Sequence, residues 1–185
     1  IHPQLQLILY NFLKEANQVA KSQLFITTHS PTLTSKVPLE NLILLDSKAF
    51  IISECFTDRS GENIVQDTVK NSVLSQADID AKKKQLQRYI DVTKSQLFYA
   101  KGCLFVEGIS EELLMVAFCM VEGFSLEDYI IELVNVDGIS FYPLLFLFNC
   151  VTASKRLPKK TAVLTDDDRF TDSKDKQYNI DKLVE

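Results

Sequence analysis

Acidic residues follow three apolar segments in the second half of the chain. Carboxylates that crowd at the end of a buried strand repel one another unless a positive charge lies among them. Hard divalent cations such as Mg²⁺ and Mn²⁺ are the natural counter-charge, because they prefer oxygen ligands. The pattern therefore predicts a metal site built from some of these side chains: Glu107 after residues 103–106, Asp137 after residues 130–136, and Asp166, Asp167 and Asp168 shortly after residues 161–164.

Spacing indicates which of these acids can share one cleft. Asp166 and Asp168 alternate along an extended backbone and can point to the same side, whereas Asp167 would point away. Glu111 lies four residues after Glu107, in the first turn of the expected next helix, and can return to the same cleft. A negative side chain at a helix N-terminus is also favoured by the helix dipole, which is the competing explanation for Glu111. We predict that Glu107, Glu111, Asp166 and Asp168 together hold metal.

The elements around these acids alternate between strand and helix. Strands are expected at 103–106, 130–136 and 161–164, and helices at 111–121 and at about 141–151. This order predicts a parallel α/β unit. Active sites of open parallel sheets form beyond the carboxyl ends of the strands, which is where the acids fall.

The first half of the chain has a different pattern. Apolar residues between Leu5 and Val19 recur at helical spacing, and residues 23–28 are typical of a short strand that ends at His29-Ser30-Pro31. Further strands are expected at 41–45 and 50–53, and Ser75 can cap a helix that runs to about Gln96. Its basic run, Lys82 to Lys84, is interpreted as a solvated face, with DNA contact as the alternative. We place a domain boundary between residues 1–95 and residues 96–185.

Composition excludes several classes of protein. The chain has 185 residues, 46% of them apolar, and no stretch of about 18 uncharged apolar residues that would span a membrane. A net charge of −5 argues against a protein that coats nucleic acid by counterion release. Four widely spaced cysteines without a CxxC pattern are expected to be buried, reduced thiols of a cytoplasmic protein. With two histidines in the chain, a zinc site is not expected.

Two groups of motifs resemble one known family. Phe105-Val106-Glu107-Gly108, Asp137-Gly138 and Leu164-Thr165-Asp166-Asp167-Asp168 are similar to the motifs of a Toprim domain. More narrowly, they resemble the OLD (overcoming lysogenisation defect) family, which joins an ABC-type ATPase to a C-terminal Toprim nuclease and includes the nuclease subunit of the Gabija anti-phage system. Residues 1–6 are similar to the segment after the Walker B acids of these ATPases, and residues 25–31 to their switch-histidine strand.

The resemblance implies both a fold and roles for individual residues. It implies the C-terminal end of an ABC-type ATPase domain followed by a Rossmann-like Toprim domain. Asp137 is either an extra ligand or a turn residue. The implied site comprises Glu107 for metal binding and general acid/base work, Glu111 for a second metal, the paired Asp166 and Asp168, the turn glycines Gly108 and Gly138, and His29 as the nucleotide sensor.

The implied function is cleavage or nicking of DNA that depends on two Mg²⁺ or Mn²⁺ ions and is regulated by the attached ATPase. The resemblance also implies a role in anti-phage defence. DNA, a homo-dimer or homo-tetramer and a helicase-like subunit are the implied partners, with ATP bound in the full-length protein. The chain opens directly into a helical pattern without an initiator Met and stops in what resembles the start of another element, so we expect a segment of a longer protein whose Toprim domain is cut at its C-terminus. Walker A, Walker B and the ABC signature are missing here, so we expect this chain alone neither to bind nor to hydrolyse ATP. The alternative is a non-catalytic metal-binding module that assembles or regulates an ATPase complex.

Overall fold

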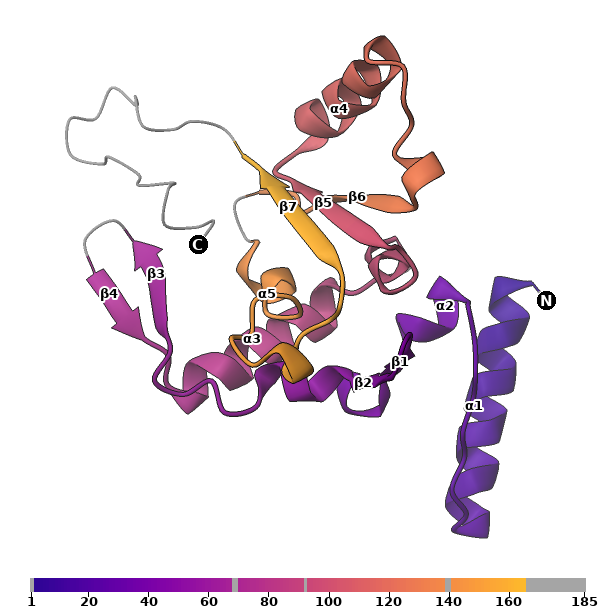
Figure 1. The fold of residues 1–185 in the computed structure, drawn as a ribbon. Coiled ribbons are helices and arrows are strands. Elements are labelled where there is room, and N and C mark those ends of the chain that lie inside the picture. The colour runs from indigo at the N-terminus through magenta and orange to yellow at the C-terminus, as the bar shows by residue number, and fades with distance from the viewer. Residues whose placement is uncertain (1, 68–69, 92, 139–140, 166–185) are drawn as a thin grey trace.

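The structure is a computed structural model that describes residues 2–67, 70–91, 93–138 and 141–165. A three-stranded parallel sheet lies at its centre, with helices on both sides and a long N-terminal helix beside the rest of the chain (Figure 1). None of the described helices combines the length and the apolar character that crossing a membrane requires.

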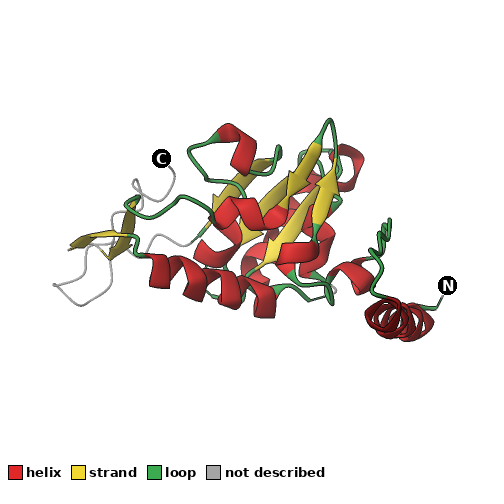
Figure 2. Cartoon of the chain, turned by 90° about the horizontal axis from the view of Figure 1, so that it is seen from below, coloured by secondary structure: helices red, strands yellow, loops and turns green. Residues whose placement is uncertain are grey.

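The parallel sheet has the strand order β6-β5-β7, with β5 in the middle. Figure 2 shows the strands in yellow, with helices packed beside them. Its registers are level, because Gly102 pairs with Ile131 and Lys160 at one end, and Val106 pairs with Asn135 and Leu164 at the other. The predicted parallel α/β unit is therefore confirmed. The elements of this half are β5 (Gly102–Val106), α4 (Ile109–Val121), η4 (Glu127–Tyr129), β6 (Ile131–Asn135), α5 (Tyr142–Leu145), η5 (Ala153–Lys155) and β7 (Lys160–Leu164).

The first half of the chain contains helices and two antiparallel hairpins. Helix α1 has His2 as its N-cap and proline in its first turn, and it ends at Lys21, whose φ is 47°. Helix α3 begins with a reciprocal capping box in which Ser75 and Asp78 each bond the other's backbone. These elements are α1 (Pro3–Ala20), α2 (Pro31–Thr34), η1 (Leu39–Asn41), β1 (Ile43–Leu45), β2 (Ala49–Ile51), η2 (Ile52–Phe56), β3 (Asn63–Asp67), β4 (Lys70–Val73), α3 (Gln76–Tyr89) and η3 (Lys94–Phe98).

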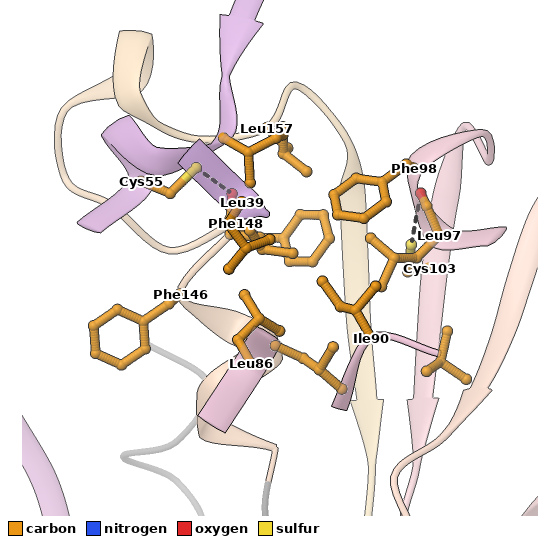
Figure 3. Close-up of a cluster of buried hydrophobic side chains, with 14 of the residues drawn as sticks. Leu39, Cys55, Leu86, Ile90, Leu97, Phe98, Cys103, Phe146, Phe148 and Leu157 are labelled. Atoms are coloured by element: carbon orange, nitrogen blue, oxygen red, sulfur yellow. Dashed lines mark hydrogen bonds between the residues drawn. The ribbon is translucent and has the colours of Figure 1, made fainter. Parts of the chain in front are cut away.

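One hydrophobic core joins residues from both sides of the predicted boundary at residue 95. Leu39 and Leu86 from the first half lie in the same buried cluster as Phe105 and Phe146 from the second half. Figure 3 shows this cluster, with the thiol of Cys103 directed to the carbonyl of Leu97. Its members cover one face of the parallel sheet, and burial of this apolar surface is the main force that holds the sheet on α3 and α5.

The other face of the sheet is covered by α4, which contacts β5 and β6. Cys119 is the residue of α4 that is buried. The side chains of Leu113 and Phe118 are 65% and 57% exposed, although the helix is apolar along most of its length. The sheet is thus well packed on the α3 side and thinly covered on the α4 side.

Two of the elements predicted in the first half of the chain are wrong in kind or in length. Residues 23–28 form no strand, because no strand of the described residues pairs with them. The helix expected to reach Gln96 ends at Tyr89, since Ile90 adopts an extended backbone and a short 3-10 helix follows from Lys94. The antiparallel pair of β3 and β4 was not expected.

The helix predicted over 141–151 is limited to the four residues of α5. The carbonyls after it bond to distant groups instead of continuing the helix. The Phe146 carbonyl accepts from the Arg59 guanidinium, and the Leu147 carbonyl accepts from the backbone N–H of Leu157. An apolar run buried on all sides need not be helical when its backbone finds partners elsewhere.

Candidate functional site

The carboxyl ends of the three parallel strands meet at one edge of the sheet. Because Val106, Asn135 and Leu164 are level, the residues that follow them emerge side by side. Glu107 follows β5, the turn at Asp137 follows β6 by one residue, and Thr165 follows β7 directly. Of the acids predicted at the strand ends, Glu107 and Asp137 lie at this edge, and Asp166, Asp167 and Asp168 lie outside the described residues.

Glu107 is bonded to both neighbouring strand ends. Its side-chain Oε2 accepts a hydrogen bond of 2.6 Å from the hydroxyl of Thr165. Its backbone carbonyl accepts one of 2.7 Å from the N–H of Gly138. The side chain is half-buried. Glu107 is therefore fixed at the centre of the edge, where a side chain from any of the three strand ends can approach it.

The turn after β6 depends on its glycine. Asp137 has a φ of 55° and Gly138 a φ of 129°, a backbone conformation that side-chain-bearing residues rarely adopt. The Asp137 N–H donates to Oδ1 of Asn135 at 2.9 Å, which tightens the turn. This geometry brings the Gly138 N–H to the Glu107 carbonyl. Gly138 thus has the conformation that the predicted turn requires.

The glycine at position 108 is explained by space and not by backbone conformation. Its φ of −150° is ordinary extended backbone, so its conformation does not select glycine. A Cβ at this position would come within 3.3 Å of Glu111 Oε2, because that carboxylate accepts a hydrogen bond of 2.9 Å from the Gly108 N–H. The close approach of the Glu111 side chain explains the glycine.

Glu111 and Glu112 lie in the first turn of α4, and both carboxylates have partners. Glu111 bonds the N–H that precedes its own helix, which accounts for a glutamate here without any metal. Oε2 of Glu112 accepts a hydrogen bond of 2.8 Å from the side-chain amide of Asn135. This bond ties the start of α4 to the end of β6, and neither Glu112 nor Asn135 was among the predicted site residues.

A lysine from the first half of the chain reaches the same edge. Nζ of Lys94 lies 3.7 Å from a carboxylate oxygen of Asp137 and 3.7 Å from one of Asp91. Asp91 also accepts from the Lys94 backbone N–H at 2.7 Å. The Lys94 side chain is 15% exposed, whereas that of Asp137 is 78% exposed. Sequence reasoning missed this pair, because nothing in the spacing of Lys94 relates it to residue 137.

The donor atoms at this edge suit a hard divalent cation. Glu107, Glu111 and Asp137 contribute carboxylates and Thr165 a hydroxyl, and oxygen ligands of this kind match Mg²⁺ or Mn²⁺. Asp166 and Asp168, the predicted aspartate pair, lie outside the described residues. Within the part of the chain that is described, no three His, Cys, Asp or Glu side chains converge to hold an ion. The ligand set therefore stays a prediction.

The four cysteines are buried and free, as predicted. Burial raises the pKa of the Cys55 thiol and that of the Cys103 thiol to about 12. Thiols with so high a pKa stay protonated at neutral pH and are poor nucleophiles.

His29 lies at the opposite end of the sheet from Glu107. Its ring centre is 5.9 Å from that of Tyr99, and Tyr99 precedes the amino end of β5. A cavity of about 640 Å³ opens beside it, lined by residues of α1 and by residues 26–33. The role of His29 as a nucleotide sensor stays a prediction, as does the assignment of this half of the chain to an ATPase.

Comparison with known proteins supports the resemblance. Residues 98–168 match the family model described as "Overcoming lysogenization defect protein-like, TOPRIM domain". The chain is also 28% identical over 152 residues to Endonuclease GajA of Bacillus cereus (strain HuB5-5). That match covers 75% of this chain and 21% of GajA, so the chain spans about a fifth of the length of this curated relative. The matched family segment contains β5, β6, β7 and every predicted carboxylate of the site.

Proposed function

Because residues 98–168 are an OLD-like Toprim domain, we propose that the strand-end edge is the active site of a divalent-metal-dependent DNA endonuclease. The observation that carries the proposal is the position of Glu107. It lies at the end of the central strand and is bonded to both neighbouring strand ends. GajA, which is named an endonuclease, is 28% identical to this chain, and this likeness supports the same reaction class.

Each acid has a stated role in this proposal. Glu107, Glu111, Asp166 and Asp168 would hold two Mg²⁺ or Mn²⁺ ions. When bound, such ions lower the pKa of water and stabilise the leaving oxygen of a phosphodiester. Glu107 would also accept or donate the proton at the scissile phosphate. Lysine contacts to phosphates would position the DNA strand without reading its bases.

Regulation and assembly belong to the same proposal. An attached ABC-type ATPase would control cleavage through ATP and His29. The protein would act as a homo-dimer or homo-tetramer, with a helicase-like subunit, in anti-phage defence. Support for this part is the resemblance of residues 1–6 and 25–31 to the ATPase motifs and the partial likeness to GajA.

One observation favours a second candidate function. The Glu111 carboxylate is accounted for by the start of α4, and the described residues alone assemble no cluster of three ligands. An edge that binds metal weakly and cuts nothing would act as an assembly or regulatory module of an ATPase complex. The two candidates differ in whether metal supports cleavage.

Plasmid nicking by the full-length protein with Mg²⁺ or Mn²⁺ tests the proposal. We expect metal-dependent nicking that is lost in Glu107→Ala and in Asp166→Ala. Glu122→Ala, at the exposed C-terminal end of α4, is the matched control and should nick as the parent does. No nicking with either metal by folded, nucleotide-free protein would contradict the endonuclease and favour the regulatory module. Nicking that survives in Glu107→Ala would remove Glu107 from the site.

A further inference from the structure

Thr165 makes a contact that its place in the sequence does not suggest. It follows β7 directly and immediately precedes Asp166. Its Oγ1 donates to Oε2 of Glu107 at 2.6 Å, across 58 positions of the chain. A hydroxyl that donates to a carboxylate at this distance belongs to the strong, charge-assisted class of hydrogen bond.

The bond completes a two-sided support of Glu107. Gly138, from the end of β6, holds the Glu107 backbone carbonyl at 2.7 Å. Thr165, from the end of β7, holds the Glu107 side chain. Main chain and side chain are thus fixed from opposite neighbours of the central strand. A glutamate side chain turns about three bonds, so a directional donor at its carboxylate selects one orientation among many.

Strand propensity alone does not account for this threonine. A β-branched residue suits the end of a strand, and valine would serve equally well for that purpose. Valine lacks the hydroxyl, which is the group that contacts Glu107. The half-buried setting of both side chains strengthens the hydrogen bond, because less water competes for the two oxygens.

We propose that Thr165 is a positioning residue that orients the Glu107 carboxylate toward the metal ions and the DNA phosphate. The inference rests on the proposed endonuclease function, and it deepens the account of the same site. Thr165 acts through Glu107 and makes no contact with DNA in this account. Partners of this kind on a ligating carboxylate are typically worth about 10–100-fold in metal affinity or activity when they are removed.

The test compares three variants of the full-length protein. Thr165→Val keeps the shape and removes the hydroxyl, Thr165→Ser keeps the hydroxyl, and Thr161→Val changes an exposed threonine earlier in β7 as the matched control. Measurements are kcat and KM for plasmid nicking, Mn²⁺ affinity by calorimetry, and Tm. We expect Thr165→Val to lose about 10–100-fold in kcat or in Mn²⁺ affinity at nearly unchanged Tm and KM. Thr165→Ser should retain most of both, and Thr161→Val should match the parent.

Each other outcome has a definite meaning. Parent-like kcat and Mn²⁺ affinity in Thr165→Val would overturn the inference while leaving the endonuclease in place. Equal losses in Thr165→Val and Thr165→Ser would also overturn it, since the hydroxyl would then not be the group that matters. If the parent does not nick at all, the endonuclease proposal fails. The Mn²⁺ measurement then decides alone: weaker binding in Thr165→Val supports the orienting hydrogen bond, and unchanged binding refutes it.

Discussion

Arg59 links the first half of the chain to the loop after α5, and its removal should lower stability sharply. The side chain is 2% exposed. Its guanidinium bonds Glu62 Oε2 at 2.8 Å, the Phe146 carbonyl at 3.2 Å and the Asn149 side-chain oxygen at 2.9 Å. It also lies over the Phe146 ring, 4.1 Å from the ring centre. The change we consider is Arg59→Ala.

The expected loss follows from what the substitution leaves behind. Removing one partner of a buried ion pair costs about 3–5 kcal/mol, because an uncompensated charge remains. Glu62 is 23% exposed and can recover some hydration, which places this case near the lower end, at about 3 kcal/mol. For a chain of this size, a loss of that order lowers Tm by about 6–12 °C. The Phe146 carbonyl, left without its donor, adds to the penalty.

Urea unfolding and thermal melting measure the effect. Arg88→Ala is the matched control, because Arg88 is exposed on α3, and it should change stability by less than about 0.5 kcal/mol. Arg59→Lys should recover only part of the loss, since an ammonium lacks the planar fork that meets acceptors of four residues. Equal unfolding midpoints for Arg59→Ala and Arg88→Ala, at equal slopes, would refute the reasoning.

Three further predictions concern titration, reactivity and the start of α4. Burial raises the pKa of Glu132, so its charged form is disfavoured in the folded chain. Glu132→Gln should therefore increase stability at pH 7, and the gain should disappear as pH falls through the folded-state pKa; a gain of equal size in acid would contradict this. Because burial raises the pKa of the Cys55 and Cys103 thiols to about 12, iodoacetamide should modify them only after unfolding in urea, and rapid labelling of the native chain would be the opposing result. Glu111→Gln keeps an acceptor for the Gly108 N–H, so Tm should hold while Mn²⁺ affinity by calorimetry falls; unchanged affinity would make Glu111 a helix-start residue only.

Local patterns predicted the elements whose formation depends on local sequence. The start of α3 followed from Ser75 and Asp78, whose reciprocal capping box is present. The parallel strands followed from short apolar runs that alternate with helical ones, and the position of Glu107 followed from the end of one such run. The capping box lies within a few residues of its pattern, whereas the strands were predicted from the alternation of apolar runs and are held by pairing with distant segments.

The failures have the opposite character. Residues 23–28 have the composition of a strand, but a strand exists only where another one pairs with it, and the sequence does not show that partner. The helix predicted over 141–151 ends with α5, and the Phe146 carbonyl just after it accepts from Arg59, 87 positions away. Thr165 and Lys94 also reach the site through contacts with residues far away in the sequence. Interactions over such separations are set by the packed core, which no local spacing reveals.

The kinds of partner at the strand-end edge separate its acids into two groups. Glu111 accepts from a backbone amide, which is a neutral donor. A neutral donor orients the Glu111 carboxylate and leaves its negative charge for a cation. The partner of Asp137 is the ammonium of Lys94, which compensates that charge and would repel a metal ion nearby. Asp137 also adopts the left-handed backbone conformation of its turn. This contrast favours the turn role for Asp137, and it favours Glu111 as an acid kept for metal.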